Sequence, residues 1–180
     1  GLVVHMHELR HRAERKANPW PGQDASGVVR TTHHAYRVET VVDEQLEIPW
    51  AVAFPSDGSV LITERPGRLR IVAEGELATV EGTPEVWAFG QGGLMDVAVH
   101  PQHADNGWVY LAYSERWREN GNDVGMTRIL RGRIERTRDG FVWSDEQTIY
   151  EPPRGLGPRT GFHFGSRIVF ADGYLYFGIR

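Results

Sequence analysis

The amino-acid sequence predicts an all-β protein built as a β-propeller. One pattern occurs three times, at residues 51–63, 96–113 and 167–178: an alternating apolar stretch, a Gly-containing turn and a second alternating stretch. Alternation on both sides of an Asp-Gly or Asn-Gly turn indicates an antiparallel hairpin, because these turn residues accept the positive φ that the hairpin needs. A single hairpin cannot bury its own apolar face. Repeated hairpins therefore stack, and four-stranded units arranged radially form a propeller.

The first 35 residues differ from the rest and are expected to form an N-terminal extension. Five of the eight histidines lie there, and residues 6–17 are expected to be poorly ordered or to form a short helix. His5, His7 and His11 would share a face of such a helix, but a disordered tail with weak metal affinity is the favoured interpretation. The apolar residues 1–4 are too short for the core of a signal peptide, so no export signal is visible.

Residues 36–180 are expected to be the N-terminal portion of the propeller domain. The stretch 36–42 is predicted as a strand that pairs elsewhere in the ring. The first blade is predicted with strands at 51–54, 60–63 and 68–72 and an undefined outer strand. The second blade is predicted with strands at 94–100, 108–114, 127–136 and 141–150, with residues 117–125 as a polar loop, and the third blade begins near Ser166.

The length of the chain fits only part of such a ring. Blades have roughly 40 to 50 residues and a ring needs at least four, so the 180 residues supply about two and a half blades. We therefore expect an incomplete fragment of a longer protein, inactive by itself.

The composition excludes several classes of function. The net charge is −4, with 20 Lys and Arg against 24 Asp and Glu, and this argues against a nucleic-acid partner. No stretch is long and apolar enough to cross a bilayer. Cysteine is absent, so thiol catalysis, thiolate metal sites and disulfides are excluded.

Two loops flanked by glycine carry the candidate functional residues. GQGG at 90–93 precedes the first strand of the second blade, and GFHFG at 161–165 precedes that of the third. The first strand of each blade lines the central channel of a propeller, so Gln91 and His163 are expected to converge near the axis. An imidazole suits the removal of a hydroxyl proton, and an amide can donate to one ligand atom while accepting from another.

Four ordered motifs from about residue 36 onward resemble the soluble PQQ-dependent aldose sugar dehydrogenases, the glucose/sorbosone dehydrogenase family. They are IPWAVAF at 48–54, TERPGRLR at 63–70, GQGGLMDVAVHP at 90–101 and HFGSR at 163–167. The resemblance implies a six-bladed propeller holding pyrroloquinoline quinone (PQQ) and Ca²⁺, in the periplasm or secreted. It also implies oxidation of an aldose at C1, with hydride transfer to PQQ and an external electron acceptor. His163 would be the general base, and Gln91 would lie beside substrate and cofactor.

The chain also departs from the family pattern. Phe162 stands where some members carry Asp, and it cannot accept a hydrogen bond or hold an imidazolium. Arg180 occupies a position where other members have the Gly of a Gly-Asp pair. The family's cofactor-binding cations and calcium ligands belong to later blades, so no metal ligand is assigned. A non-catalytic binding propeller of the same ancestry, as in hedgehog-interacting-type proteins, therefore stays open, and a calcium-dependent lactonase-type propeller is less favoured.

The other polar and aromatic residues are expected to be structural. His100 and His103 are interpreted as a strand end followed by a turn, and Asp96 as a satisfied carboxylate. Four tryptophans are expected to pack between blades: Trp50, Trp87, Trp108 and Trp143. A solvated hairpin edge is expected from Glu64, Arg65, Arg68 and Arg70.

Overall fold

The computed structural model describes residues 27–42, 46–156 and 159–179, and the chain divides into two units between residues 45 and 46. Residues 6–17 and the three histidines predicted to share a helical face lie outside the described residues.

The first unit contains one antiparallel hairpin. It pairs β1 (Val28–Arg30) with β2 (Ala35–Arg37), and Val29 lies opposite Tyr36. The strand predicted at 36–42 ends at Arg37 and forms part of this local hairpin. Tyr36 pairs locally because the short turn at residues 31–34 brings a second alternating stretch alongside it.

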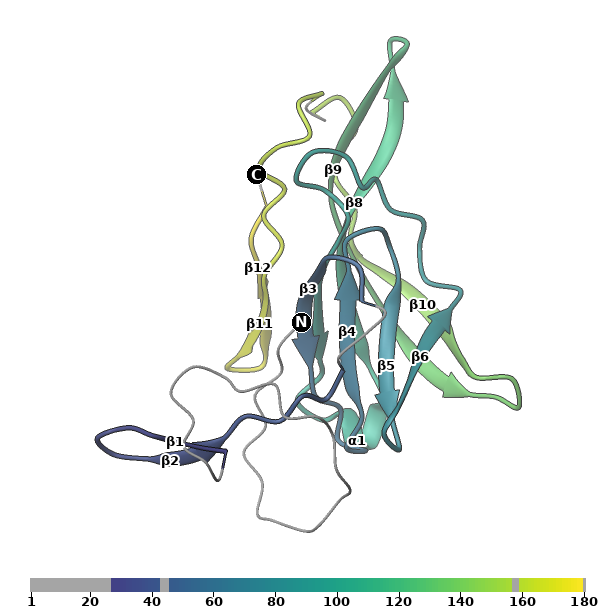
Figure 1. The fold of residues 1–180 in the computed structure, drawn as a ribbon. Coiled ribbons are helices and arrows are strands. Elements are labelled where there is room, and N and C mark those ends of the chain that lie inside the picture. The colour runs from purple at the N-terminus through teal and green to yellow at the C-terminus, as the bar shows by residue number, and fades with distance from the viewer. Residues whose placement is uncertain (1–26, 43–45, 157–158, 180) are drawn as a thin grey trace. The chain divides into compact units, whose positions relative to one another are not determined.

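The first blade consists of four antiparallel strands in chain order (Figure 1). They are β3 (Pro49–Ala53), β4 (Val60–Glu64), β5 (Leu69–Ala73) and β6 (Glu76–Glu81). The outer strand that the sequence left undefined is β6. It is joined to β5 by Glu74 and Gly75, whose φ angles of 54° and 84° fit a type I′ turn.

The second blade has the same four-stranded order and a short helix after its inner strand. Its elements are β7 (Leu94–Val99), α1 (His103–Asn106), β8 (Val109–Glu119), β9 (Asn122–Arg136) and β10 (Phe141–Tyr150). The prediction of a polar loop at 117–125 is wrong, because β8 and β9 stay paired out to Glu119 and Asn122. Asn120 and Gly121 close this hairpin with φ angles of 49° and 77°, so the polar residues belong to a long hairpin.

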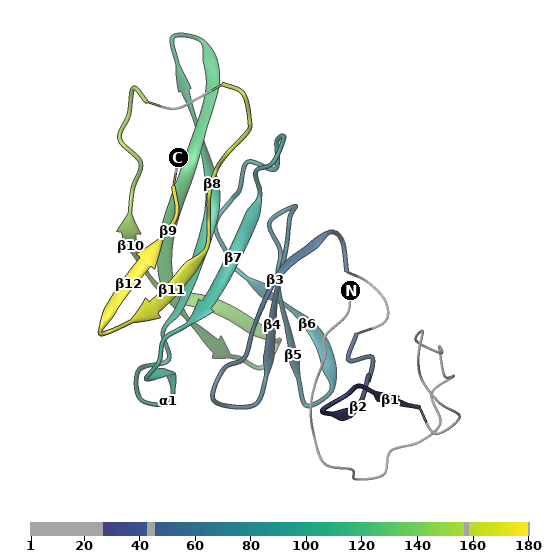
Figure 2. The ribbon, with the colours of Figure 1, turned by 90° about the vertical axis from the view of Figure 1, so that its left-hand side faces the viewer.

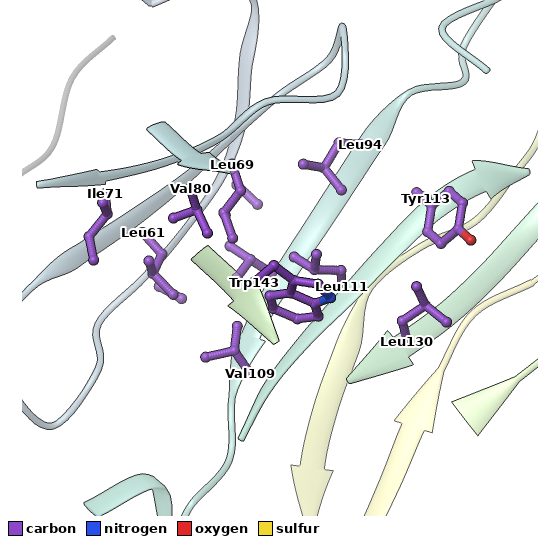
Figure 3. Packing of buried hydrophobic residues seen from close by; sticks show 13 residues of the cluster. Leu61, Leu69, Ile71, Val80, Leu94, Val109, Leu111, Tyr113, Leu130 and Trp143 are labelled. Carbon is purple, nitrogen blue, oxygen red and sulfur yellow. The ribbon is translucent and has the colours of Figure 1, made fainter. Parts of the chain in front are cut away.

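The two blades form one eight-stranded sheet that nearly closes on itself. The outer strands β6 and β10 pair in parallel, with Val80 opposite Phe141. The inner strands β3 and β7, at the two ends of the strand order, contact each other (Figure 2). Between the blades lies the larger apolar core (Figure 3), which includes Leu61, Leu69, Leu94, Val109, Leu111 and Trp143. The interblade packing predicted for Trp143 is confirmed.

A third hairpin follows the second blade. It pairs β11 (Ile168–Ala171) with β12 (Tyr174–Phe177), and Ile168 packs in a second core against β8 and β9.

The buried carboxylate of Asp96 on β7 accepts hydrogen bonds from the Ile168 N–H at 2.8 Å and from Arg167 at 3.2 Å. Burial raises the pKa of Asp96, and these two donors oppose that shift. Asp96 thus joins two inner strands, as expected of a structural carboxylate. The described residues from 46 onward thus form two four-stranded blades of a β-propeller and the first hairpin of a third.

Candidate functional site

Gln91 and His163 meet although they are 72 positions apart in the chain. The Gln91 Oε1 accepts a hydrogen bond from the backbone N–H of His163 at 2.9 Å. The Gln91 backbone N–H donates to the Gly161 carbonyl at 2.7 Å. Their loops precede β7 and β11, which begin at the same end of the second and third blades (Figure 2). The predicted convergence of Gln91 and His163 is confirmed.

Glycine is required where these two loops touch. Gly90 has a φ of 57°, and a Cβ added there would lie 2.3 Å from the Gly161 carbonyl oxygen. A Cβ added at Gly161, with a φ of 68°, would lie 2.6 Å from the Phe89 ring. Both distances are far below van der Waals contact, so the absence of side chains lets one loop lie directly on the other.

The Gly90→Ala substitution is expected to separate the two loops, because the new methyl group meets backbone atoms that cannot rotate away. The His163 N–H should then exchange with solvent faster, since its hydrogen bond to Gln91 is lost. Amide hydrogen exchange measures this. Gly121→Ala is the matched control, because it has a φ of 77° but nothing within 4 Å of the added Cβ. Equal exchange rates of the His163 N–H in the two variants would contradict the prediction.

Arg65 holds the loop that carries Gln91, contrary to its predicted place on a solvated edge. Its guanidinium donates to the carbonyls of Gly92 at 3.1 Å, Gly90 at 2.8 Å and Ala88 at 3.0 Å. Its own carbonyl accepts from the Leu94 N–H at 3.2 Å. No local pattern reveals this role, because the three carbonyl partners lie 23 to 27 residues away along the chain.

The prediction of a solvated edge is also wrong for Glu64, whose side chain is fully buried. Its carboxylate accepts hydrogen bonds from Arg68 at 2.6 Å, from Arg70 at 3.4 Å and from the Glu47 backbone N–H. Burial alone would raise the pKa of Glu64, but the Arg68 hydrogen bond, the Glu47 N–H and Arg70 outweigh it and lower the pKa. Glu64 therefore braces the β4–β5 turn from which Arg65 extends.

The loop that carries His163 rests on an aromatic support. His163 is exposed and has a φ of 65°, whereas the next residue, Phe164, is only 4% exposed. The Phe164 carbonyl accepts a hydrogen bond from Thr127, and its ring meets Trp87 edge-on at 6.3 Å. Trp87 therefore packs beneath the site, a place that the sequence did not predict. The imidazole is presented at the surface by a loop with a buried anchor.

The other histidines of this unit have local partners. The His100 Nδ1 lies 3.0 Å from the Gln102 backbone nitrogen and 2.9 Å from the Asn106 side-chain nitrogen, and the His103 Nδ1 lies 2.9 Å from the Ser56 hydroxyl. Among the residues that the structure describes, no group of three or more His, Cys, Asp or Glu side chains could hold a metal ion.

Fold and site together define a propeller in which the Gln91 amide contacts the backbone of an exposed histidine where the inner strands of adjacent blades begin. Residues 46–180 match the family model of glucose / sorbosone dehydrogenases, and the chain belongs to this family. The aldose sugar dehydrogenase YliI of Escherichia coli is 37% identical over 145 residues. An uncharacterized protein of Synechocystis is 35% identical over 153 residues.

Solved structures agree with this assignment. The soluble aldose sugar dehydrogenase of Escherichia coli in its apo-form has a TM-score of 0.63 and 38% identity, and the match covers 74% of this chain and 38% of that one. The PQQ-bound aldose sugar dehydrogenase of Streptomyces coelicolor has a TM-score of 0.56 and 25% identity, over 75% of this chain and 38% of that one. Against the two curated relatives, the matches cover 79% and 77% of this chain but only 34% and 37% of theirs.

Proposed function

We propose that the protein containing this chain is a PQQ-dependent oxidoreductase that oxidises an aldose at C1, with His163 as the general base. The observation that carries the proposal is the contact between Gln91 and the backbone of His163. It supports the proposal because it holds the backbone of His163, whose side chain is exposed, against the Gln91 carboxamide, so that one sugar could be reached by both residues. Membership of a family that includes aldose sugar dehydrogenases supports the substrate class.

Each group of the site has a part in the proposed reaction. The His163 imidazole removes the proton of the anomeric hydroxyl as C1 is oxidised, because a positioned imidazole can accept a proton near neutral pH. The Gln91 oxygen is engaged by the His163 N–H, so its amide nitrogen is the group that faces a ligand oxygen. PQQ, when bound, would supply the two-electron acceptor for the hydride that leaves C1.

We propose that the described residues form one side of a PQQ site. Gly90 and Gly161 let the two loops lie against each other, and the His163 imidazole and Gln91 amide would supply a base and a hydrogen-bond donor. The nearby Arg65 guanidinium uses its Nε and Nη2 to hold three carbonyls of the Gln91 loop, so we assign it to the support of that loop. We propose that the cofactor-binding cations, and the ligands of Ca²⁺, come from other parts of the protein.

Reconstitution tests the proposal. The full-length protein with PQQ and Ca²⁺ is expected to reduce a redox dye when an aldose is added, and omission of PQQ should abolish the reaction. The 180-residue chain assayed in parallel is expected to be inactive, as proposed for a fragment. An absence of turnover in the PQQ-loaded full-length protein, with sugar binding retained, would favour the non-catalytic binding propeller instead.

The structure has, among its described residues, no helix with the length and apolar character needed to cross a membrane. We propose the periplasm or the cell exterior as the location of the protein, from the family resemblance. Fractionation of cells that express the full-length gene would test this.

A further inference from the structure

Two large apolar side chains lie half exposed beside the site. Phe89 is 49% exposed and precedes Gln91 by two residues, and Phe162 is 51% exposed and directly precedes His163. The Phe162 ring lies 6.3 Å from the His163 ring, tilted by 50°. Exposed apolar groups rimmed by polar ones mark binding surfaces, because water is displaced from them at a gain in free energy.

The Phe89 ring is held in a fixed place. It stacks on Trp87 at 5.0 Å with an interplanar angle of 19°. It also lies against Gly161, where an added Cβ would come 2.6 Å from a ring atom. Because Phe162 follows Gly161 directly, Phe89 and Phe162 flank the same short piece of backbone.

The Phe162 side chain is not needed to anchor its loop. Phe164 serves that purpose, with 4% exposure, a hydrogen bond from Thr127 to its carbonyl and a ring contact with Trp87. The left-handed backbone at His163, with a φ of 65°, separates the buried Phe164 from the exposed Phe162. The loop therefore keeps one phenyl ring for packing and leaves the other available to a ligand.

We propose that Phe89 and Phe162 form an aromatic platform that binds the C–H face of the pyranose ring of the aldose substrate. This inference rests on the proposed function and names the binding surface of the same site. The C–H groups of a pyranose carry partial positive charge and pack against the negative face of a phenyl ring, while its hydroxyls point outward from the ring edge. A sugar on this platform would direct edge hydroxyls toward Gln91, two residues after Phe89, and toward His163, whose ring lies 6.3 Å from that of Phe162.

Kinetics of the full-length, PQQ-loaded protein test the platform. Phe162→Leu keeps an apolar side chain but removes the aromatic face, and it is expected to raise KM for the aldose about three- to tenfold and to change kcat less, from the usual strength of such ring contacts. Phe162→Trp is expected to keep KM close to that of the wild type. Phe54→Leu is the control, because Phe54 is 52% exposed and follows the end of β3 away from Arg65. An unchanged KM in Phe162→Leu would overturn the proposal. A lower affinity for PQQ together with an unchanged KM for the aldose would overturn it as well.

A binding measurement separates this inference from the proposed function. Methyl β-glucopyranoside has no free anomeric hydroxyl, so it cannot be oxidised at C1. Irradiation of the aromatic protons of the protein should transfer saturation to the ring C–H protons of this sugar, and Phe162→Leu should weaken that transfer. Aldose oxidation with equal transfer in both proteins would overturn the platform and leave the proposed function standing. Transfer that depends on Phe162, without oxidation of any aldose, would support the platform and overturn the proposed function.

Discussion

Replacement of His163 by Asn is expected to lower kcat for aldose oxidation about 10²- to 10⁴-fold, the usual contribution of a positioned general base. Asn is the informative replacement because residue 163 has a φ of 65°, and Asn tolerates this left-handed conformation better than Ala. It offers no group that accepts a proton near neutral pH. The comparison is made by steady-state dye reduction with the full-length protein loaded with PQQ.

The geometry of the site allows the loss of the base to be separated from damage to the loop. Gln91 accepts its hydrogen bond from the backbone N–H of residue 163, which the substitution leaves in place. PQQ affinity and the exchange rate of that N–H should therefore stay close to those of the wild type. His103→Asn, in the helix after β7, serves as the control and should leave kcat unchanged. A His163→Asn enzyme with normal kcat would remove His163 from the role of base.

The convergence of Gln91 with His163 could be predicted because it depends on a repeat. Each loop precedes the first strand of a hairpin unit, and repeated units place equivalent loops at the same end of a propeller. The alternating residues of β3, β4, β8 and β11 showed where those units lie. The two hydrogen bonds of Gln91, to the His163 N–H and to the Gly161 carbonyl, join the two glycine-flanked loops directly.

The sequence did not reveal the β8–β9 hairpin tip or the roles of Arg65 and Glu64. The hairpin tip is made of polar strands, and the two side chains bind partners that the local sequence does not identify. The tip of the β8–β9 hairpin is charged or polar at most positions, so no alternation of apolar and polar residues identifies its strands. Only Asn120 and Gly121 indicate the turn. Arg65 looks like a surface cation until its carbonyl partners in the next loop are known. The four-residue spacing between Glu64 and Arg68 is compatible with a solvated pair as well as with a buried one.

Replacement of Glu64 by Gln is expected to lower the free energy of unfolding by about 3 kcal/mol near neutral pH, because one partner of a buried ion pair is removed. The side chain of Glu64 is fully buried, and that of Arg70 is only 9% exposed. The neutral amide would remove the negative charge that Arg68 and Arg70 contact at this buried position. Chemical denaturation of the full-length protein measures the difference, with Glu74→Gln as the control. Glu74 forms a similar pair with Arg136, but in solvent, so its replacement should leave stability nearly unchanged.

The pH dependence of the stability lost in Glu64→Gln follows from the direction of the pKa shift of Glu64. The pKa of Glu64 is lowered in the folded protein from its ordinary value of 4.5. The unfolded chain therefore binds the proton more readily, and the stabilising contribution is fully present above the ordinary pKa. It is lost as the pH falls through the lower pKa of the folded state. The difference between wild type and Glu64→Gln should shrink in this acidic range, and a difference independent of pH would contradict the assignment.

The Glu64 substitution should also reach the functional site, because the residue that follows Glu64 holds the loop of Gln91. The Glu64 N–H donates to the Arg68 carbonyl at 2.8 Å, and its own carbonyl accepts from Gly67 at 2.9 Å, so the turn and the carboxylate support each other. A loosened turn would move the Arg65 guanidinium away from the carbonyls of Gly90 and Gly92. The Gln91 N–H, which donates to Gly161, should then exchange faster in Glu64→Gln than in Glu74→Gln. Equal exchange rates of the Gln91 N–H in the two variants, despite the lower stability of Glu64→Gln, would show that Glu64 stabilises the β4–β5 hairpin without affecting the Gln91 loop.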